Sequence, residues 1–385
     1  MEGHHHSGTF MTLAPWDSVF FTRIARCGYE TDQIHAFFPL LPAGQWTIAQ
    51  LLYPLRFLVS YDELLVLSGL ILNVAAFAVA ALSLHRLTHH VLGSEIWADY
   101  ATIFFCFNPA SIFYSAVYTE SLFAAASFVG MLLVEKQSFW AGVFCFALAA
   151  AARSNGILLC GYLIYPLLKQ TCVERGVPLL RVLRCAAGCV VVCLPYILMQ
   201  EMAYRTYCVG YPAEARAPWC HKRVPSLYSY VQAQYWDWPK VLMSCPVLLL
   251  SARACWTWAR ADWRDALTLG LEGPLTRPRL SPSLPVGAPR PGRGGRSPKR
   301  FELVWPPAQR TAHPYVYHWA FMLVVAATVM HVNVATRFLS SCPPLYWFVA
   351  TLMEPGGRGA RWIWTWALGF AALGTLLLPN FYPWT

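Results

Sequence analysis

Charged residues are scarce in this sequence. Aspartate, glutamate, lysine and arginine together make up 12% of its 385 residues, whereas hydrophobic residues make up 57%. The average soluble domain carries about twice that share of charge. The composition therefore excludes an ordinary soluble globular protein and indicates a membrane protein.

The sequence also lacks the short motifs of soluble-cofactor chemistry. It contains no Walker loop, no dinucleotide-binding glycine fingerprint, no His/Cys cluster at metal-ligand spacing and no nucleophile elbow. Much of the net charge of +10 lies in one Pro/Gly-rich stretch, at about 270–310, so it reflects loop bias rather than a nucleic-acid surface. We therefore expect no metal site, no soluble cofactor and no nucleic-acid partner, which leaves membrane-embedded transfer chemistry or transport.

Long apolar runs fill much of the remaining chain. Leu64–Leu84 has no charged residue, and a spanning helix needs about 20 mainly apolar residues. Further apolar segments, several of them too short to cross alone, are Tyr100–Thr119, Ser121–Val134, Ser138–Ala152, Ser154–Leu168, Cys185–Gln200, Val241–Ala252, Pro314–Ala335, Pro343–Met353 and Trp362–Leu378. The pattern predicts an all-α, polytopic membrane protein of about eight to ten membrane segments, the shorter ones being half-helices or re-entrant pieces.

The distribution of lysine and arginine orients these segments. Basic residues cluster at His85–His90, at Lys169–Arg184 and after Arg253, which places these loops in the cytosol. The alternating loops then face the other side, including the N-terminal segment and the loop 205–238. We expect a luminal N-terminal catalytic-loop region (1–42), a transmembrane bundle (43–258), a disordered basic cytosolic loop (259–313) and C-terminal transmembrane segments (314–385).

Most of the thirteen cysteines lie inside apolar segments, where cysteine behaves as a small hydrophobic residue. Cys208 and Cys220 differ because both fall in the outer loop, twelve positions apart. If that side is the lumen of the endoplasmic reticulum, the environment is oxidising. We expect these two residues to form a disulfide, and the others to be free thiols.

Asp17 is one of the few acidic residues near the outer face, and it lies among aromatic residues. A partly desolvated carboxylate there could act as a general base toward a sugar hydroxyl. The alternatives are a helix N-cap and a surface carboxylate paired with Arg23.

Three charged residues interrupt or end apolar segments: Glu120, Arg153 and Arg337. An ionisable group at such depth usually faces a cavity or a partner. Glu120 and Arg153 could form a structural pair or a polar hairpin tip, or Arg153 could bind a phosphate through its fork of donors. Arg337 could likewise hold a lipid phosphate, or its side chain could extend to the membrane surface.

The motifs together resemble the GPI mannosyltransferase 2 family (PIG-V type) over nearly the whole chain. The matching stretches are Pro15-Trp16-Asp17 with Gly28-Tyr29, Ala36-Phe37-Phe38-Pro39, Asn108-Pro109-Ala110, Tyr118-Thr119-Glu120-Ser121-Leu122-Phe123-Ala124, Arg153-Ser154-Asn155-Gly156, Pro218-Trp219-Cys220, Tyr228-Ser229-Tyr230-Val231-Gln232 with Tyr235-Trp236, Thr336-Arg337-Phe338-Leu339, Tyr346-Trp347-Phe348 and Pro383-Trp384-Thr385.

This resemblance implies a GT-C type glycosyltransferase fold in the endoplasmic reticulum membrane, with a luminal active site. The enzyme would take mannose from dolichyl-phosphate mannose and add the second, α-1,6-linked mannose to the glycosylphosphatidylinositol (GPI) precursor. The Trp-Asp pair of the family's first luminal loop maps onto Trp16 and Asp17. Asp17 is then the catalytic residue, and Trp16, Glu120, Arg153 and Arg337 contact the substrates. The partners would be the lipid-linked donor, the acceptor and a small membrane subunit.

The sequence departs from the family pattern in three places. A hydrophobic helix usually precedes the Trp-Asp loop and none is expected here, Pro15 stands where a histidine is frequent, and the segment from Trp236 to Leu248 is short. These departures keep two other readings open. One is an inactive, truncated subunit or scaffold, and the other is a lipid or sugar transporter.

Overall fold

The computed structural model describes residues 14–174, 176–209, 212, 214, 216, 218–221, 238–261, 263–269, 271, 312–328, 335–353 and 358–380. Within these ranges the chain forms helices and turns and no β-strand, so the predicted all-α class is confirmed. The helices are α1 (Asp17–Cys27), η2 (Gln33–Ala36), α2 (Leu40–Leu51), η3 (Tyr53–Phe57), α3 (Tyr61–Leu92), α4 (Glu95–Cys106), α5 (Ser111–Ser115), α6 (Glu120–Glu135), α7 (Phe139–Ala152), η4 (Ser154–Cys160), α8 (Gly161–Glu174), α9 (Leu179–Tyr204), η5 (Arg205–Val209), η7 (Pro218–His221), α10 (Trp238–Ala261), α11 (Trp263–Leu267), α12 (His313–Thr328), α13 (Ala335–Leu339), α14 (Pro343–Leu352) and α15 (Arg358–Leu377).

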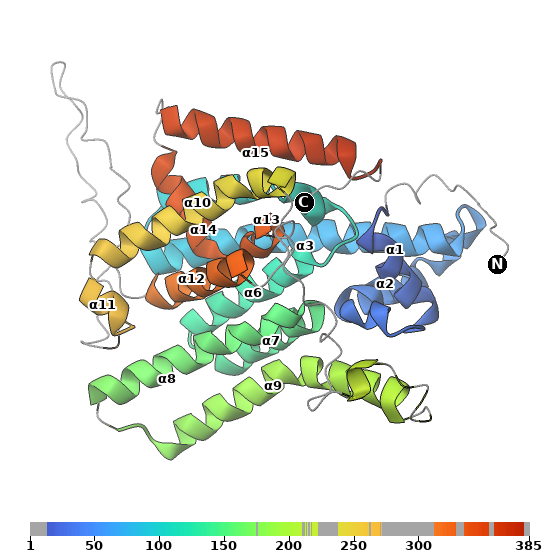
Figure 1. Ribbon diagram of the computed structural model, residues 1–385, viewed down its shortest axis with the longest axis horizontal. Coiled ribbons are helices and arrows are strands. Elements are labelled where there is room, and N and C mark those ends of the chain that lie inside the picture. Colours follow the sequence, from blue (N-terminus) through green and yellow to red (C-terminus); the bar gives the residue numbers. More distant parts are fainter. Residues whose placement is uncertain are drawn as a thin grey trace.

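The longest helix, α3, runs through the bundle and packs against α2, α4 and α6 (Figure 1). Both of its ends are fixed by local sequence. At the start, Ser60 and Glu63 form a capping box, in which each side chain accepts a hydrogen bond from the other residue's backbone N–H. At the end, Gly93 adopts a left-handed conformation with φ 69°, and its N–H donates to the carbonyl of His89.

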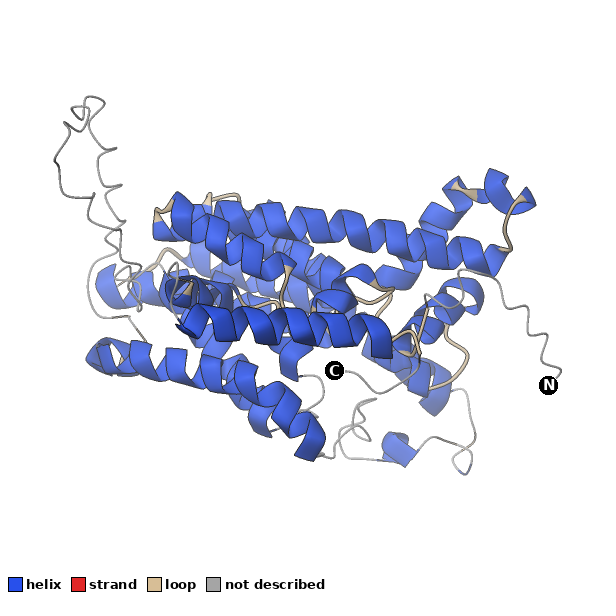
Figure 2. Ribbon diagram, turned by 90° about the horizontal axis from the view of Figure 1, so that it is seen from above, coloured by secondary structure: helices blue, strands red, loops and turns tan. Residues whose placement is uncertain are grey.

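The other helices cover α3 from several sides. One layer runs from α6 through α7 to α9, and another group brings α14 against α4 and α12 against α13 (Figure 1). Figure 2 shows that the described part of the chain consists of helices joined by loops. The core between them is unusually aromatic and includes the fully buried Trp319, Trp347 and Tyr346. The indole N–H of Trp347 donates to the hydroxyl of Thr88 at 2.8 Å, which satisfies its polar atom inside the bundle.

Among the residues that the structure describes, two helices are long and apolar enough to cross a membrane: Tyr61–Leu92, and Leu179–Val209, which combines α9 with η5. Half of the most apolar window of the first is buried in the bundle, compared with 22% of the second. The second helix therefore turns most of its apolar surface outward. The number of membrane segments, about eight to ten, stays a prediction.

The structure shows where two of the apolar segments are interrupted. The chain does break at Arg153, which separates α7 from η4. The apolar segment Tyr100–Thr119 also contains a break, between the end of α4 at Cys106 and the start of α5 at Ser111. There the side-chain oxygen of Asn108 accepts the N–H of Ala110 in a local turn that contains Pro109.

The predicted disordered loop 259–313 is partly helical. The end of α10, all of α11 and the start of α12 fall inside this range. Trp263–Leu267 forms α11, directly after α10. The sequence predicts disorder here because the composition becomes basic. The intervening low-complexity stretch lies outside the described residues.

Candidate active site

Four charged side chains from separate segments meet at one end of α6. Glu120 is the first residue of α6, Arg153 lies between α7 and η4, and Arg337 belongs to α13. Asp17 begins α1 and approaches from the N-terminal region. The structure thus brings together the four charged residues that the sequence analysis selected.

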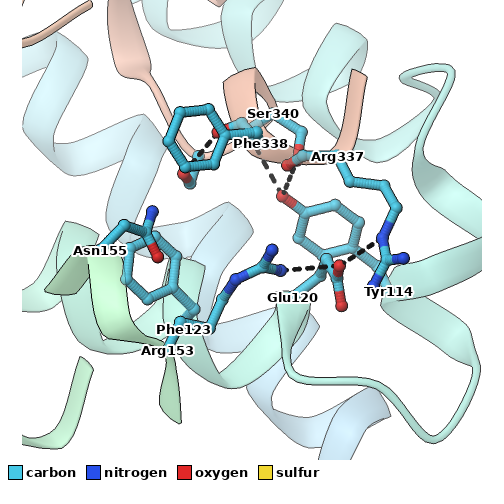
Figure 3. A pocket seen from close by; sticks show the side chains of 9 residues that line it. Tyr114, Glu120, Phe123, Arg153, Asn155, Arg337, Phe338 and Ser340 are labelled. Carbon is cyan, nitrogen blue, oxygen red and sulfur yellow. Dashed lines mark hydrogen bonds and ion pairs between the residues drawn. The ribbon is translucent and has the colours of Figure 1, made fainter. Parts of the chain in front are cut away.

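Glu120 lies at the centre of this cluster. One of its carboxylate oxygens, Oε1, accepts hydrogen bonds from Arg153 Nη1 at 2.7 Å and from Arg337 Nε at 2.6 Å. The two guanidinium groups approach from opposite sides in Figure 3. The Glu120 side chain is 1% exposed, and those of Arg337 and Arg153 are 11% and 18% exposed. These are charge-assisted hydrogen bonds in a largely dry environment, which fix the orientation of both arginines.

The second oxygen of Glu120 has no hydrogen-bond partner within the described residues. It is buried, and it points away from both arginines in Figure 3. A buried carboxylate oxygen is costly to leave unpaired. It is therefore a ready acceptor for a hydroxyl group or a water molecule.

Arg337 also contacts aromatic rings. Its guanidinium carbon lies 4.4 Å from the ring centre of Phe113 and 4.8 Å from that of Tyr118. Such contacts stabilise a cation that has lost most of its water. The predicted alternative, in which Arg337 extends to the membrane surface, does not fit a side chain held between Glu120 and these rings.

Asp17 is the most accessible of the four, with 39% of its side chain exposed. Its Oδ2 lies 3.6 Å from Nη1 of Arg337. Burial raises the pKa of the Asp17 carboxyl and outweighs the nearby Arg337, which lowers it. The alternative pairing with Arg23 is wrong, because Arg23 binds Glu30 at 2.5 Å, and the N-cap of α1 is Trp16 rather than Asp17.

Trp16 has an unusual backbone conformation next to Asp17. Its φ is 54° and its ψ is −120°, and its side chain is 41% exposed. A bulky residue at positive φ costs about 1–3 kcal/mol. This strained turn sets the direction in which α1 starts, and with it the position of the Asp17 carboxylate.

A pocket lies beside the cluster and contains residues that the sequence analysis did not select as site residues. Its lining is Tyr114, Glu120, Phe123, Arg153, Asn155, Arg337, Phe338, Ser340 and Ser341. Tyr114 is fully buried and donates to the hydroxyl of Ser340 at 2.9 Å, which ties α5 to the turn after α13. Tyr114 stands inside an apolar segment, so nothing in the sequence distinguishes it from a core aromatic residue.

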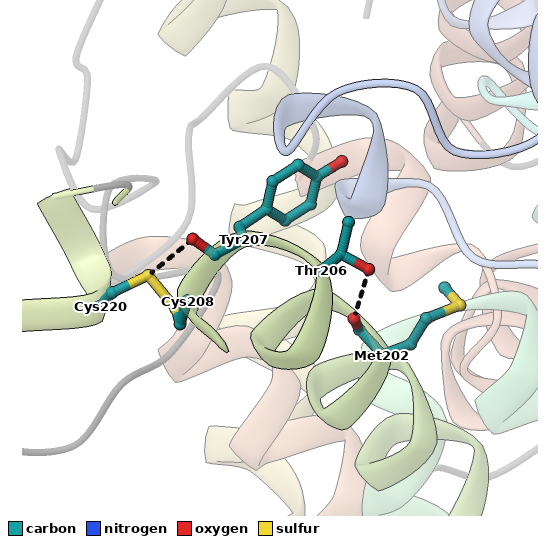
Figure 4. The surroundings of a disulfide bond; sticks show 5 residues. All are labelled: Met202, Thr206, Tyr207, Cys208 and Cys220. Carbon is teal, nitrogen blue, oxygen red and sulfur yellow. Dashed lines mark hydrogen bonds between the residues drawn. A yellow bond between two sulfur atoms is a disulfide. The ribbon is translucent and has the colours of Figure 1, made fainter. Parts of the chain in front are cut away.

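Cys208 and Cys220, the pair expected to form a disulfide, are joined by one in the structure (Figure 4). The bond closes the segment after α9, where Trp219 is buried against it. Next to Cys208, Tyr207 packs edge-on against His35, with ring centres 5.2 Å apart. This contact links the disulfide to η2, the short helix that follows α1.

Some predicted features lie outside the described residues. These are the outer-loop aromatics Tyr228, Tyr230, Tyr235 and Trp236 and the motif at Pro383–Thr385. Among the residues that the structure describes, no group of three or more His, Cys, Asp or Glu side chains is arranged to hold a metal ion. The charged groups that do converge are two arginines, which suit a phosphate group, and two carboxylates, which suit a proton transfer.

Comparison with known proteins agrees with this chemistry. The family model described as "Mannosyltransferase (PIG-V)" matches residues 3–385. The GPI alpha-1,6-mannosyltransferase 2 of Mus musculus is 34% identical over 382 aligned residues, which cover 89% of this chain and 73% of the mouse protein. The human protein of the same name is 32% identical over the same shares, and the GPI mannosyltransferase 2 of Drosophila pseudoobscura pseudoobscura is 29% identical over 97% of this chain and 86% of its own length. No solved structure shows a significant match. The chain belongs to the PIG-V mannosyltransferase family.

Proposed function

We propose that this protein transfers mannose from dolichyl-phosphate mannose to the GPI precursor, forming an α-1,6 bond and adding the second mannose. The names of its relatives support the reaction and the acceptor. The observation that carries the proposal is the cluster of Asp17 with Arg337, Glu120 and Arg153. It combines a carboxylate of raised pKa with two fixed cations, which are the groups that transfer from a sugar phosphate requires.

In this proposal Asp17 is the catalytic base. Its carboxylate takes the proton of the acceptor hydroxyl while the hydroxyl oxygen attacks the anomeric carbon of mannose. The bond from that carbon to the phosphate oxygen breaks with inversion, and dolichyl phosphate leaves with the electron pair. The raised pKa makes Asp17 a stronger base than an exposed aspartate, and its partial exposure leaves it within reach of a substrate.

The arginines stabilise the leaving group. The donor phosphate is a diester with one negative charge, and the departing monoester has up to two. Cations that are already oriented stabilise charge that develops in the transition state, and removing one such group typically costs a factor of about 100 to 1,000. Arg337 is the first candidate because it lies between Asp17 and Glu120, and Arg153 is the second.

Glu120 is a positioning residue for both arginines. Its bonded oxygen fixes the two guanidinium groups, and its unpaired oxygen is available to a sugar hydroxyl or a water molecule. Trp16 offers an exposed aromatic face beside Asp17 on which a sugar ring could stack.

The setting we propose is a multi-pass protein of the endoplasmic reticulum membrane with a GT-C type fold. Asp17 and the disulfide then lie on the luminal side, because disulfides persist in oxidising compartments. This proposal keeps the luminal region 1–42, the bundle 43–258, the cytosolic loop 259–313 and the final segments 314–385. It also includes a small membrane subunit as a partner.

Complementation tests the function directly. The chain is expressed in cells that lack the second GPI mannosyltransferase, and surface GPI-anchored protein is read by flow cytometry. The wild-type chain should restore the signal and Asp17→Asn should not, although both reach the membrane at equal levels. Asp32→Asn, which removes a carboxylate from the nearby loop, is the matched control and should behave as wild type. Rescue by Asp17→Asn would exclude the role of Asp17 as the base.

A second assay separates the rival functions. Purified protein in proteoliposomes is supplied with dolichyl-phosphate mannose and a GPI-precursor acceptor, and the glycosidic product is measured. Movement of the lipid-linked sugar across the bilayer without product would identify a transporter. Absence of both, with the protein still bound to other membrane proteins, would identify a scaffold.

A further inference from the structure

A second cluster of polar side chains surrounds a hollow at the far end of α6. The hollow is lined by His85, Arg86, His89, His90, Glu95 and Lys136. These residues come from the last turns of α3, the first turn of α4 and the residue that follows α6. Three separate segments therefore contribute to one site.

This hollow is remote from the active-site cluster. Glu120 is the first residue of α6, and Lys136 immediately follows its last residue. A helix of 16 residues rises about 24 Å at 1.5 Å per residue. The two sites therefore lie at opposite ends of the same helix, a separation close to the thickness of a bilayer's hydrocarbon core.

All but one of the basic side chains at this hollow have no hydrogen-bond or ion-pair partner within the described residues. Arg86, His89, His90 and Lys136 make no side-chain hydrogen bond or ion pair there. His85 is the exception, since its Nε2 lies 3.0 Å from Oδ1 of Asp99. With the histidines neutral, the lining holds two positive charges, on Arg86 and Lys136, and one negative charge, on Glu95.

Helix capping does not account for these basic residues. The end of α3 is closed by the N–H of Gly93, which donates to the carbonyl of His89 at 2.9 Å. The end of α6 is closed by the N–H of Lys136, which donates to the carbonyl of Leu132 at 3.0 Å. The side chains of Arg86 and Lys136 are thus not needed for capping, and they remain available to a ligand.

The surface next to the hollow is apolar. Val79 and Leu82 are 46% and 60% exposed, and they precede Arg86 by seven and four residues on α3. Residues spaced in this way share one face of a helix. A ligand with its charge at Arg86 would therefore extend an apolar portion along Leu82 and Val79, toward the middle of α3.

We propose that this hollow binds the phosphate of an anionic phospholipid headgroup, whose acyl chains lie along α3. Arginine binds phosphate through its fork of donors, lysine through its compact charge and histidine through its ring N–H. Basic pockets at helix ends near the cytosolic surface bind such headgroups. The unpaired cations supply the recognition, and the exposed apolar face of α3 favours a lipid over free phosphate. This inference does not depend on the proposed transfer reaction.

Lipid retention tests the proposal. The full chain is purified in nanodiscs of phosphatidylcholine that contain a minor fraction of a phosphatidylinositol monophosphate, and bound lipid is counted by native mass spectrometry. Each Lys or Arg near a membrane surface contributes about fivefold to the binding of an anionic lipid. Arg86→Gln and Lys136→Gln should therefore each weaken retention of the anionic lipid about fivefold, with mannosyl transfer unchanged.

The matched control is Arg181→Gln in α9, an exposed arginine of the same predicted cytosolic face that does not line the hollow. It should retain the anionic lipid as wild type does. Equal losses in Arg181→Gln and Arg86→Gln would show that general surface charge is responsible and would overturn the site. Displacement of the bound lipid by inorganic phosphate would identify a free anion as the ligand and overturn the proposal of a lipid ligand. Retention of the lipid in the presence of inorganic phosphate would support that proposal. Retention of phosphatidylcholine and the anionic lipid in proportion to their supply would also overturn it.

Discussion

At the scale of single residues, the environment of Glu120 explains how four ionisable groups coexist in one cluster. A carboxylate that is 1% exposed loses nearly all of its hydration, and one arginine at one oxygen compensates for this only in part. Arg153 and Arg337 together leave a net positive charge, which the nearby Asp17 balances. The cluster is therefore neutral when empty, and in the proposed reaction it would gain a net negative charge when the donor phosphate enters.

The chemical state of Asp17 predicts a pH dependence of activity. Burial raises its pKa and Arg337 lowers it, with burial the larger effect. The catalytic form is the ionised one, so kcat/KM should rise about tenfold per pH unit below this pKa and level off above it. The inflection should lie above the usual value for aspartate, about 3.9. Measured transfer rates across the acidic range in detergent test this expectation.

A variant of Arg337 provides a control for this pH dependence. Arg337→Gln removes a positive charge that lowers the pKa of Asp17, so the pH profile of the remaining activity should show its inflection at higher pH than the wild type does. The folded protein holds the proton of Asp17 more tightly than the unfolded chain does, so ionisation of this carboxyl lowers the free energy of unfolding as the pH rises through the raised pKa. Asp17→Asn removes this effect and should therefore not lower the free energy of unfolding near neutral pH. An inflection at the ordinary aspartate pKa in the wild type would contradict the raised pKa.

Residue type and position were sufficient to select the charged members of the site, but not their contacts. Charges at the ends of apolar segments are rare, which pointed to Glu120, Arg153 and Arg337. However, Arg337 and Glu120 are separated by 217 positions, and no local pattern predicts that they share a hydrogen bond. Tyr114 could not be selected either, because its role depends on the Ser340 hydroxyl that α13 and its following turn supply.

At the scale of elements, close packing at Gly156 holds the segment that carries Arg153. A Cβ on Gly156 would lie 2.4 Å from the backbone N and Cα of Ala150 in α7. Gly156→Ala must therefore move η4 away from α7, and Arg153 would move with it. A displacement of about 1 Å near a reacting group can cost about 100-fold in rate, so we expect kcat to fall by that order.

Gly161→Ala is the matched control for this prediction. It lies at the junction of η4 and α8, and a Cβ there would meet nothing within 4 Å. This variant should transfer mannose at the wild-type rate. Equal rates for Gly156→Ala and the wild type, with equal amounts in the membrane, would show that the position of η4 does not control the site.

A series of contacts between aromatic side chains connects the disulfide to α1. Tyr207, next to Cys208, packs against His35, whose ring lies 4.4 Å from that of Tyr29. The Tyr29 hydroxyl donates to the carbonyl of Phe37 at 2.7 Å. Phe37 in turn stacks on Phe20 of α1, with ring centres 5.0 Å apart. The bond between Cys208 and Cys220 is therefore connected to the helix that begins with Asp17.

Loss of this disulfide should affect catalysis as well as local order. Closing a loop of this length contributes about 3 kcal/mol to stability. We expect Cys208→Ser to increase proteolysis after α9 and to lower kcat several-fold, because the contact of Tyr207 with His35 loosens. Cys172→Ser, which removes an exposed free thiol, is the control. If proteolysis and kcat were unchanged in Cys208→Ser, the disulfide would not contribute to the structure of the site.

At the scale of the whole molecule, the sequence predicted an apolar helical protein because hydropathy alone reports which segments avoid water. It did not predict which helices stand on their own as spanning elements. α3 is long and apolar enough to span a membrane, whereas α6 and α7 are shorter and depend on their neighbours for burial. Glu120 begins α6 and Arg153 follows the last residue of α7, so one end of each helix lies at the proposed active site.

The proposed topology places Asp17 and the basic hollow on opposite faces of the membrane, and two native cysteines can test it. Cys27 ends α1 and Cys172 lies near the end of α8, and both are exposed. In sealed microsomes, which present the cytosolic face, a membrane-impermeant maleimide should label Cys172 at once. It should label Cys27 only after the membrane is permeabilised. The variants Cys27→Ser and Cys172→Ser show which part of the labelling belongs to each of these two cysteines. The labelling that remains when both are replaced measures the background from the buried and half-buried thiols. Labelling of Cys27 in intact microsomes would place Asp17 in the cytosol, where the proposed luminal transfer could not occur.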